Sequence, residues 1–140
     1  MLQQLHSADA VFEGKRVLIV DDDVRNVFAL ASVLESRGME VLFAETGADA
    51  LRILEDDPNV DLVVMDIMMP ELDGYETIAR IRAQRQFEGL PIISLTAKAM
   101  KGDREKSIAA GASDYITKPA DTDQLLSLMR VWLYDRAATA

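Results

Sequence analysis

Five polar residues of this chain stand where apolar runs end, and their types suit the chemistry of phosphoryl groups. They are Asp21, Asp22, Asp66, Thr96 and Lys118. A continuous apolar run rich in β-branched residues is typical of a parallel strand that is buried on both faces. Open α/β sheets bind their ligands at the carboxyl ends of such strands. We therefore expect these five side chains to converge on one site.

Three carboxylates that converge repel one another unless a cation neutralises them. Oxygen ligands without histidine or cysteine favour a hard cation, Mg²⁺ or Mn²⁺, which leaves room for phosphoryl oxygens. The Lys118 ammonium and the Thr96 hydroxyl would meet those oxygens as a point charge and a hydrogen-bond donor. The small side chain of Ala97 would leave space beside them. The pattern predicts phosphoryl transfer to a carboxylate, with Asp66 as the nucleophile.

The elements that would position these residues alternate along the chain. Apolar runs predict strands at residues 15–20, 39–44, 60–66, 90–95 and 112–117. Helical periodicity between and after them predicts helices around residues 27–34, 50–54, 75–81, 103–110 and 121–134. Gly38 is expected to end the first helix, and Thr46 and Asp121 are expected to cap two others. This alternation predicts a doubly wound α/β fold, in which a five-stranded parallel sheet carries helices on both faces.

Length and composition limit the classes of protein to be considered. The 140 residues suit one domain, and 49% of them are apolar, which argues against disorder. No apolar run is long enough to span a membrane, and the absence of cysteine removes thiol chemistry. A net charge of −9 argues against a nucleic-acid surface. We expect a cytoplasmic domain at residues 15–135, after a leader or linker at 1–14 and before a tail at 136–140.

Taken together, the motifs resemble the receiver domain of two-component response regulators. They are VDD at 20–22, MDIMMP at 65–70, DG at 73–74, SLTA at 94–97 and KP at 118–119. Each motif alone is a weak signal, but all of them occur in order and at suitable spacing across residues 15–135. Residues 12–16, 23–26 and 96–100 are similar to receivers attached to hybrid sensor histidine kinases. The chain would then be either a stand-alone receiver or a piece of such a kinase.

The resemblance implies a flavodoxin-like sheet of strand order 2-1-3-4-5. It also implies that a histidine kinase or a histidine phosphotransfer protein phosphorylates Asp66. Mg²⁺ would be bound by Asp22, Asp66 and the main-chain oxygen of Met68, while Asp21 would hold a water molecule of the metal. Such a domain assists its own phosphorylation and dephosphorylation but is not an enzyme. Kinase activity is expected only if the chain is a fragment of a hybrid kinase.

The resemblance assigns roles to the residues around the phosphoryl group as well. Thr96 and Lys118 would contact it, next to Ala97, and Tyr115 falls where the family carries its aromatic switch residue, which acts with Thr96. The sharp reversal expected after Lys118 also predicts a cis peptide bond before Pro119.

Two other functions remain as alternatives. A degenerate receiver that serves only as a phosphate-independent docking module should lack an acid, the threonine or the lysine, and none is missing. A small phosphatase of the haloacid-dehalogenase type would need a second aspartate two residues after Asp66, where this chain has Met68. Apolar residues also surround more than half of the last predicted helix, which predicts self-association or another partner there.

Overall fold

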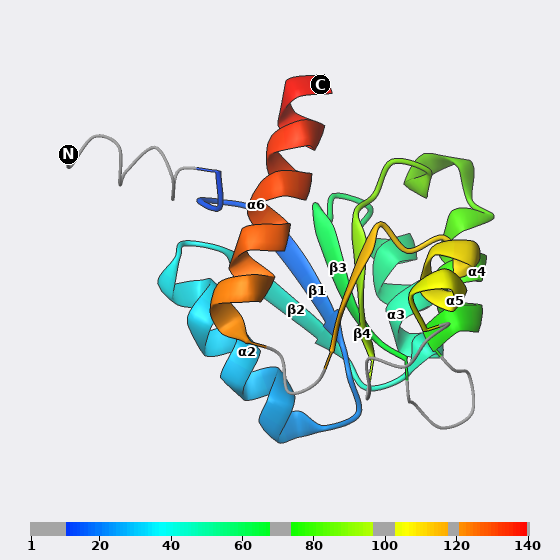
Figure 1. Ribbon diagram of the computed structural model, residues 1–140, viewed down its shortest axis with the longest axis horizontal. Helices are drawn as coiled ribbons and strands as arrows, with labels where there is room; N and C mark the ends of the chain where they lie inside the picture. The colour runs from blue at the N-terminus through cyan, green and yellow to red at the C-terminus, as the bar shows by residue number, and fades with distance from the viewer. Residues whose placement is uncertain (1–10, 68–73, 97–102, 118–120, 140) are drawn as a thin grey trace.

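The chain folds into a five-stranded parallel sheet with helices on both faces (Figure 1). The computed structural model describes residues 11–67, 74–96, 103–117 and 121–139. The strands are β1 (Arg16–Val20), β2 (Glu40–Ala44), β3 (Leu62–Asp66), β4 (Ile92–Thr96) and β5 (Asp114–Thr117). Their order is β2-β1-β3-β4-β5, and the pairing is parallel throughout. The predicted fold class and strand order are confirmed.

The predicted helices are all present, with one difference in length. They are α2 (Val24–Ser36), α3 (Gly47–Asp56), α4 (Gly74–Arg82), α5 (Asp103–Ala110) and α6 (Thr122–Thr139). A 3₁₀ helix, η1 (Arg85–Phe87), was not predicted. The prediction that the last helix ends near Tyr134 was wrong, because alanines with high helix propensity continue it to Thr139. Among the helices that the structure describes, none is both long and apolar enough to cross a bilayer.

Local capping places the helix ends next to the strands. Gly38 has a φ of 87° just after α2, a conformation that glycine adopts without steric cost. The Thr46 hydroxyl accepts a hydrogen bond from the Asp49 N–H (3.1 Å) at the start of α3. Asp121 accepts hydrogen bonds from the N–H groups of Asp123 (2.9 Å) and Gln124 (3.3 Å) at the start of α6. The three caps predicted from the sequence are confirmed.

The sheet separates two hydrophobic layers. All residues of β3 and β4 are buried, because these central strands are covered on both faces. The layer against α2 and α6 includes Val17, Ile19, Leu30 and Met129. The layer on the other face lies under α3 and α4, so that the strands are held between helices in Figure 1. Packing of this kind fixes where each strand ends, and therefore where the predicted site residues lie.

Phe12 extends the first layer beyond the predicted domain. Its side chain is fully buried and packs in the same cluster as Met129 and Leu133 of α6. The Arg130 guanidinium lies 5.3 Å from the centre of its ring, in the range of a cation–π contact. Phe12 falls within the predicted leader, so the hydrophobic core begins before residue 15.

Helix α5 contacts the sheet through a polar pair. The buried Ser94 hydroxyl of β4 donates a hydrogen bond to the buried Ser107 hydroxyl of α5 (2.9 Å). By contrast, Ile108 of the same helix is 47% exposed. At the end of α5, the Arg82 Nε donates to the Gly111 carbonyl (2.7 Å). The weak, polar helical pattern predicted for residues 103–110 therefore reflects docking by hydrogen bonds rather than by an apolar stripe.

An ion-pair network fastens the edge of the sheet where β1 begins. Arg16 donates a hydrogen bond from Nη1 to Asp57 Oδ1 (2.6 Å), and its Nη2 pairs with the other oxygen of that carboxylate. Its Nε lies 3.3 Å from the Glu40 carboxylate, and its main-chain N–H donates to Asp61 (2.9 Å). The hydrogen bonds from Arg16 hold the pKa of Asp57 below its ordinary value. The network ties β1, β2 and the turn before β3 together.

This network predicts a pH-dependent loss of stability in an Asp57→Asn variant. Because folding lowers the pKa of Asp57, its carboxylate contributes stability above the unfolded pKa, near 4, and loses it as pH falls through the folded value. The variant should therefore unfold at a lower denaturant concentration than the wild type at pH 7, and the two should approach each other in acid. Denaturant midpoints over a pH series measure this. The matched control is Asp56→Asn, at an exposed neighbour; a difference for Asp57→Asn that is constant with pH would contradict the assignment.

Candidate functional site

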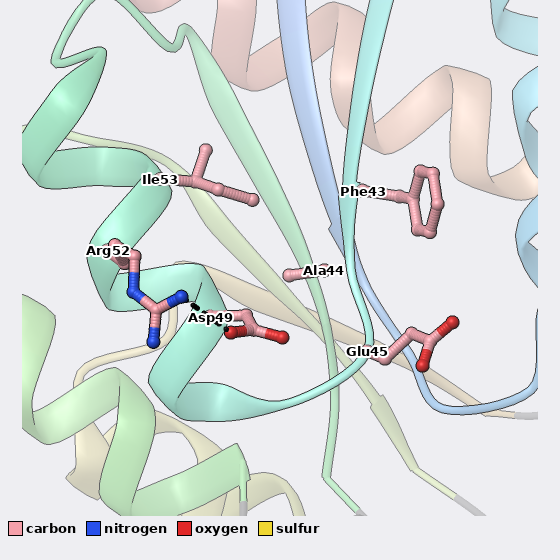
Figure 2. Close-up of a pocket in the computed structure, with 6 residues that line it drawn as sticks. All are labelled: Phe43, Ala44, Glu45, Asp49, Arg52 and Ile53. Carbon is pink, nitrogen blue, oxygen red and sulfur yellow. Dashed lines mark ion pairs between the residues drawn. The ribbon is translucent and has the colours of Figure 1, made fainter.

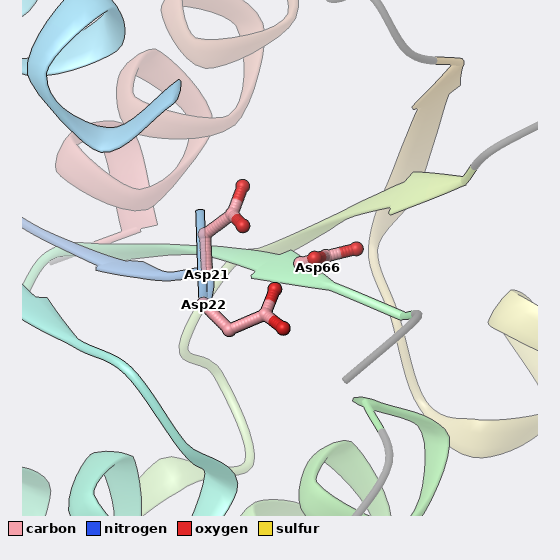
Figure 3. A group of neighbouring side chains, drawn as sticks. All are labelled: Asp21, Asp22 and Asp66. Carbon is pink, nitrogen blue, oxygen red and sulfur yellow. The ribbon is translucent and has the colours of Figure 1, made fainter. Parts of the chain in front are cut away.

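Three carboxylates meet at the carboxyl end of the sheet. Asp21 and Asp22 directly follow β1, and Asp66 is the last residue of β3, the neighbouring strand. One oxygen from each carboxylate lies within 4.8 Å of the others. Figure 3 shows the three side chains gathered beside the ends of these strands. The convergence expected from the sequence is present for these three residues.

The cluster concentrates negative charge where two of its three carboxylates are buried from solvent. Asp21 is fully buried and Asp66 is 1% exposed, whereas Asp22 is exposed. Two unit charges at the upper limit of 4.8 Å repel by about 3.5 kcal/mol at an effective dielectric constant of about 20. The donor set consists of carboxylate oxygens, which suits Mg²⁺ or Mn²⁺ rather than a soft metal. The residues present therefore fit a hard divalent cation.

Asp21 is held by two hydrogen bonds from the start of α2. Its Oδ1 accepts from the Asp23 N–H (2.9 Å), and its Oδ2 accepts from the Asn26 side-chain amide (2.5 Å). In the sequence, Asn26 entered only as part of residues 23–26, which are similar to receivers of hybrid kinases, and no role at the site was predicted for it. An asparagine at the start of a helix, where this residue type is a poor helix former, is a signal that could have pointed to it.

Thr96 brings a hydroxyl to the adjacent strand end. It is the last residue of β4 and follows Leu95, which is paired with Asp66 across the sheet. Thr96 is 2% exposed, and its Oγ1 has no hydrogen-bond partner within the described ranges. Leaving a buried hydroxyl unpaired costs roughly 1–3 kcal/mol. Among the described residues nothing accepts this hydrogen, which is compatible with the predicted role of the hydroxyl as a donor to an oxygen that enters the site.

Of the other predicted site residues, the structure describes only Tyr115. Tyr115 lies in β5, paired with Ser94 of β4, and is half-buried. Met68, Ala97 and Lys118 lie outside the described residues, as does the peptide bond before Pro119. Their roles stay predictions.

Gly74 packs directly against the backbone that carries Asp66. It begins α4, and its N–H donates a hydrogen bond to the Ile67 carbonyl (3.2 Å). A Cβ atom added at Gly74 would lie 2.4 Å from the Asp66 carbonyl oxygen and 2.6 Å from the Ile67 Cα. The sequence indicated Gly74 only as part of a turn. Its absent side chain instead allows α4 to start against the end of β3.

A second hollow lies at the end of β2 and lacks the buried carboxylates of the acidic cluster. It has a volume of about 300 Å³ and is lined by Phe43, Ala44, Glu45, Asp49, Arg52 and Ile53 (Figure 2). Asp49 and Arg52 pair with each other at 3.5 Å; Arg52 is largely exposed and Asp49 is half-buried. In Figure 2, Phe43 points away from α3 and Ile53. This hollow gathers no buried carboxylates, so the acidic cluster is the candidate site.

The predicted resemblance is confirmed by comparison with known families. The family described as the response regulator receiver domain matches residues 17–130. The chain therefore belongs to the receiver domains of two-component systems. Domains of this family are signalling modules, and the acidic cluster of this chain is compatible with the Mg²⁺ pocket that such domains carry.

Individual relatives place the chain further within the family. The sensor histidine kinase GacS of Pseudomonas protegens is 38% identical over 120 residues, which cover 84% of this chain but only 13% of GacS. The chain thus spans a small part of that relative. The receiver domain of the sensor histidine kinase PA1611 of Pseudomonas aeruginosa, whose structure has a magnesium ion coordinated in the active-site cleft, is 37% identical. It aligns with a TM-score of 0.79 over 86% of this chain and 98% of its own.

A third match comes from a complex between two signalling proteins. It is the co-crystal structure of the Saccharomyces cerevisiae histidine phosphotransfer protein Ypd1 with the receiver domain of its downstream response regulator Ssk1. The matching chain is 29% identical, with a TM-score of 0.83 over 89% of this chain and 92% of that one. The predicted likeness to receivers of sensor histidine kinases is confirmed by the first two matches.

The packing of Gly74 predicts that a single methyl group disturbs the site. Gly74→Ala should displace the backbone at Asp66 and lower stability by roughly 1–3 kcal/mol, the usual cost of overpacking. Urea unfolding measures the change. Gly89→Ala is the matched control, because a Cβ there meets nothing within 4 Å, and it should leave stability nearly unchanged. Equal effects of the two substitutions would contradict the packing argument.

Proposed function

We propose that this chain is a phosphoacceptor module that takes a phosphoryl group from a phosphohistidine onto Asp66 and so switches or relays a two-component signal. The observation that carries the proposal is the convergence of Asp21, Asp22 and Asp66 within 4.8 Å. The buried hydroxyl of Thr96 at the next strand end, which has no hydrogen-bond partner among the described residues, supports it.

A divalent cation fits the site and would be held by residues of this chain. Asp22, Asp66 and the main-chain oxygen of Met68 would bind Mg²⁺, with Mn²⁺ as a possible substitute, and Asp21 would act through a water molecule. The cation would neutralise the clustered carboxylates and stabilise negative charge on the phosphoryl oxygens.

In the transfer step, an Asp66 oxygen forms a bond to phosphorus while the bond between phosphorus and the donor imidazole nitrogen breaks. The electron pair of the broken bond stays on that nitrogen. The Thr96 hydroxyl would donate a hydrogen bond to a phosphoryl oxygen, and the Lys118 ammonium would balance the charge of the phosphoryl group, for which the small side chain of Ala97 would leave space. Thr96 and Tyr115 lie on neighbouring strands, and the family resemblance suggests that movement of the Thr96 hydroxyl toward the phosphoryl group would be coupled to Tyr115 as a switch.

The donor would be a histidine kinase or a histidine phosphotransfer protein. The complex of Ypd1 with the Ssk1 receiver supports this class of partner. As part of this proposal, the exchange would take place in the cytoplasm. The exposed Val131 and Tyr134 of α6 offer a surface for self-association. No nucleic-acid or membrane partner is proposed.

The two alternatives are less well supported. A phosphate-independent docking module has no need for three acids within 4.8 Å, or for a buried hydroxyl at the next strand end that lacks a partner among the described residues. A phosphatase of the haloacid-dehalogenase type lacks its second acid, since residue 68 is methionine.

Mass spectrometry after incubation with acetyl phosphate and Mg²⁺ tests the proposal. The wild type should gain one phosphoryl group, and Asp66→Asn, which keeps the shape but removes the nucleophile, should gain none. Asp23→Asn is the control, because asparagine preserves the helix cap at this neighbouring acid and labelling should persist. Labelling of Asp66→Asn to the wild-type extent, or no labelling of the wild type, would defeat the proposal.

A further inference from the structure

Asn26, in helix α2, contacts the acidic cluster from outside it. Its side-chain amide lies 2.5 Å from Oδ2 of Asp21 and donates a hydrogen bond to it. Asn26 stands in the first turn of α2 and is half-buried, whereas Asp21 is fully buried. A side chain of the helix thus reaches back to a carboxylate at the end of β1.

This hydrogen bond is not needed to cap the helix. The N-cap of α2 is Asp23, whose side chain accepts a hydrogen bond from the Arg25 N–H (3.0 Å). Asparagine is a poor helix former in the turn that it occupies. The local structure of α2 therefore does not explain why residue 26 is an asparagine. The hydrogen bond to Asp21 explains it.

The side-chain amide of Asn26 can donate a hydrogen bond to a carboxylate without adding positive charge to the acidic cluster. A buried carboxylate needs hydrogen-bond donors. A lysine or arginine at residue 26 would supply them but would cancel the negative charge of Asp21 as an ion pair. The amide of Asn26 satisfies one oxygen and leaves the charge of the cluster undiminished. It also fixes the orientation of the carboxylate relative to Asp66.

We propose that Asn26 is a positioning residue for divalent-cation binding, acting through the carboxylate of Asp21. The inference rests on the proposed function, since it assumes that the acidic cluster binds Mg²⁺. Residues that orient a metal site from its outer shell typically change metal affinity by roughly 10–100-fold when they are replaced. Asn26 should act in this way, without touching the cation itself.

Isothermal titration with Mg²⁺ measures this effect, at a temperature where every variant is folded. Asn26→Ala should raise the dissociation constant by about 10-fold. Alanine favours the helix, so this variant is expected to fold. The matched control is Asn59→Ala, at an exposed asparagine in the turn before β3, and it should bind Mg²⁺ as the wild type does. A residue with a merely structural role would change the unfolding free energy in EDTA but not the dissociation constant.

A double-mutant cycle tests whether Asn26 acts through Asp21. In an Asp21→Asn background, Asn26→Ala should produce no further loss of Mg²⁺ affinity. A further loss as large as that in the wild type would overturn the inference, as would an Asn26→Ala protein that binds Mg²⁺ normally. Either result would leave the proposed function intact. A wild type that does not bind Mg²⁺ would contradict both.

Discussion

The repulsion between carboxylates that the parallel sheet brings together is the constraint on which this structure depends. Neighbouring parallel strands end at the same edge, so burial of β1 and β3 necessarily places Asp21 and Asp66 side by side. The same packing that stabilises the fold thus creates a concentration of negative charge. In the proposed function, a divalent cation would neutralise that charge and would then be positioned to bind phosphoryl oxygens, which links the core of the domain to its proposed chemistry.

The rest of the site follows from holding these carboxylates in place. Asn26 holds Asp21 without neutralising it, and Gly74 lets α4 start against the backbone of Asp66. The Thr96 hydroxyl supplies a donor at the adjacent strand end. The ion pairs of Arg16 fasten the opposite edge of the sheet, where charges are paired. Acidic side chains are therefore paired with an arginine at one end of the sheet and clustered with one another at the other.

The sequence was most informative where short-range pattern determines structure. Buried strands, helix caps at Thr46 and Asp121, and the convergence at the strand ends follow from apolar runs and from the geometry of parallel sheets. Contacts between elements that are distant in the sequence leave no comparable short-range pattern of residue types. The burial of Phe12 under α6 and the contact of Gly74 with the end of β3 depend on how the elements pack, which hydropathy does not encode. The continuation of α6 depended on alanine propensity rather than on amphipathic spacing.

The free energy of unfolding as a function of Mg²⁺ concentration tests the central claim most directly. Wild-type stability should rise with Mg²⁺, approaching about 1.4 kcal/mol for each tenfold increase above the dissociation constant. In EDTA, an Asp22→Ala variant should be more stable than the wild type, because it removes like charge, and Mg²⁺ should stabilise it much less. Wild-type stability that does not respond to Mg²⁺, together with a less stable Asp22→Ala protein in EDTA, would contradict the account.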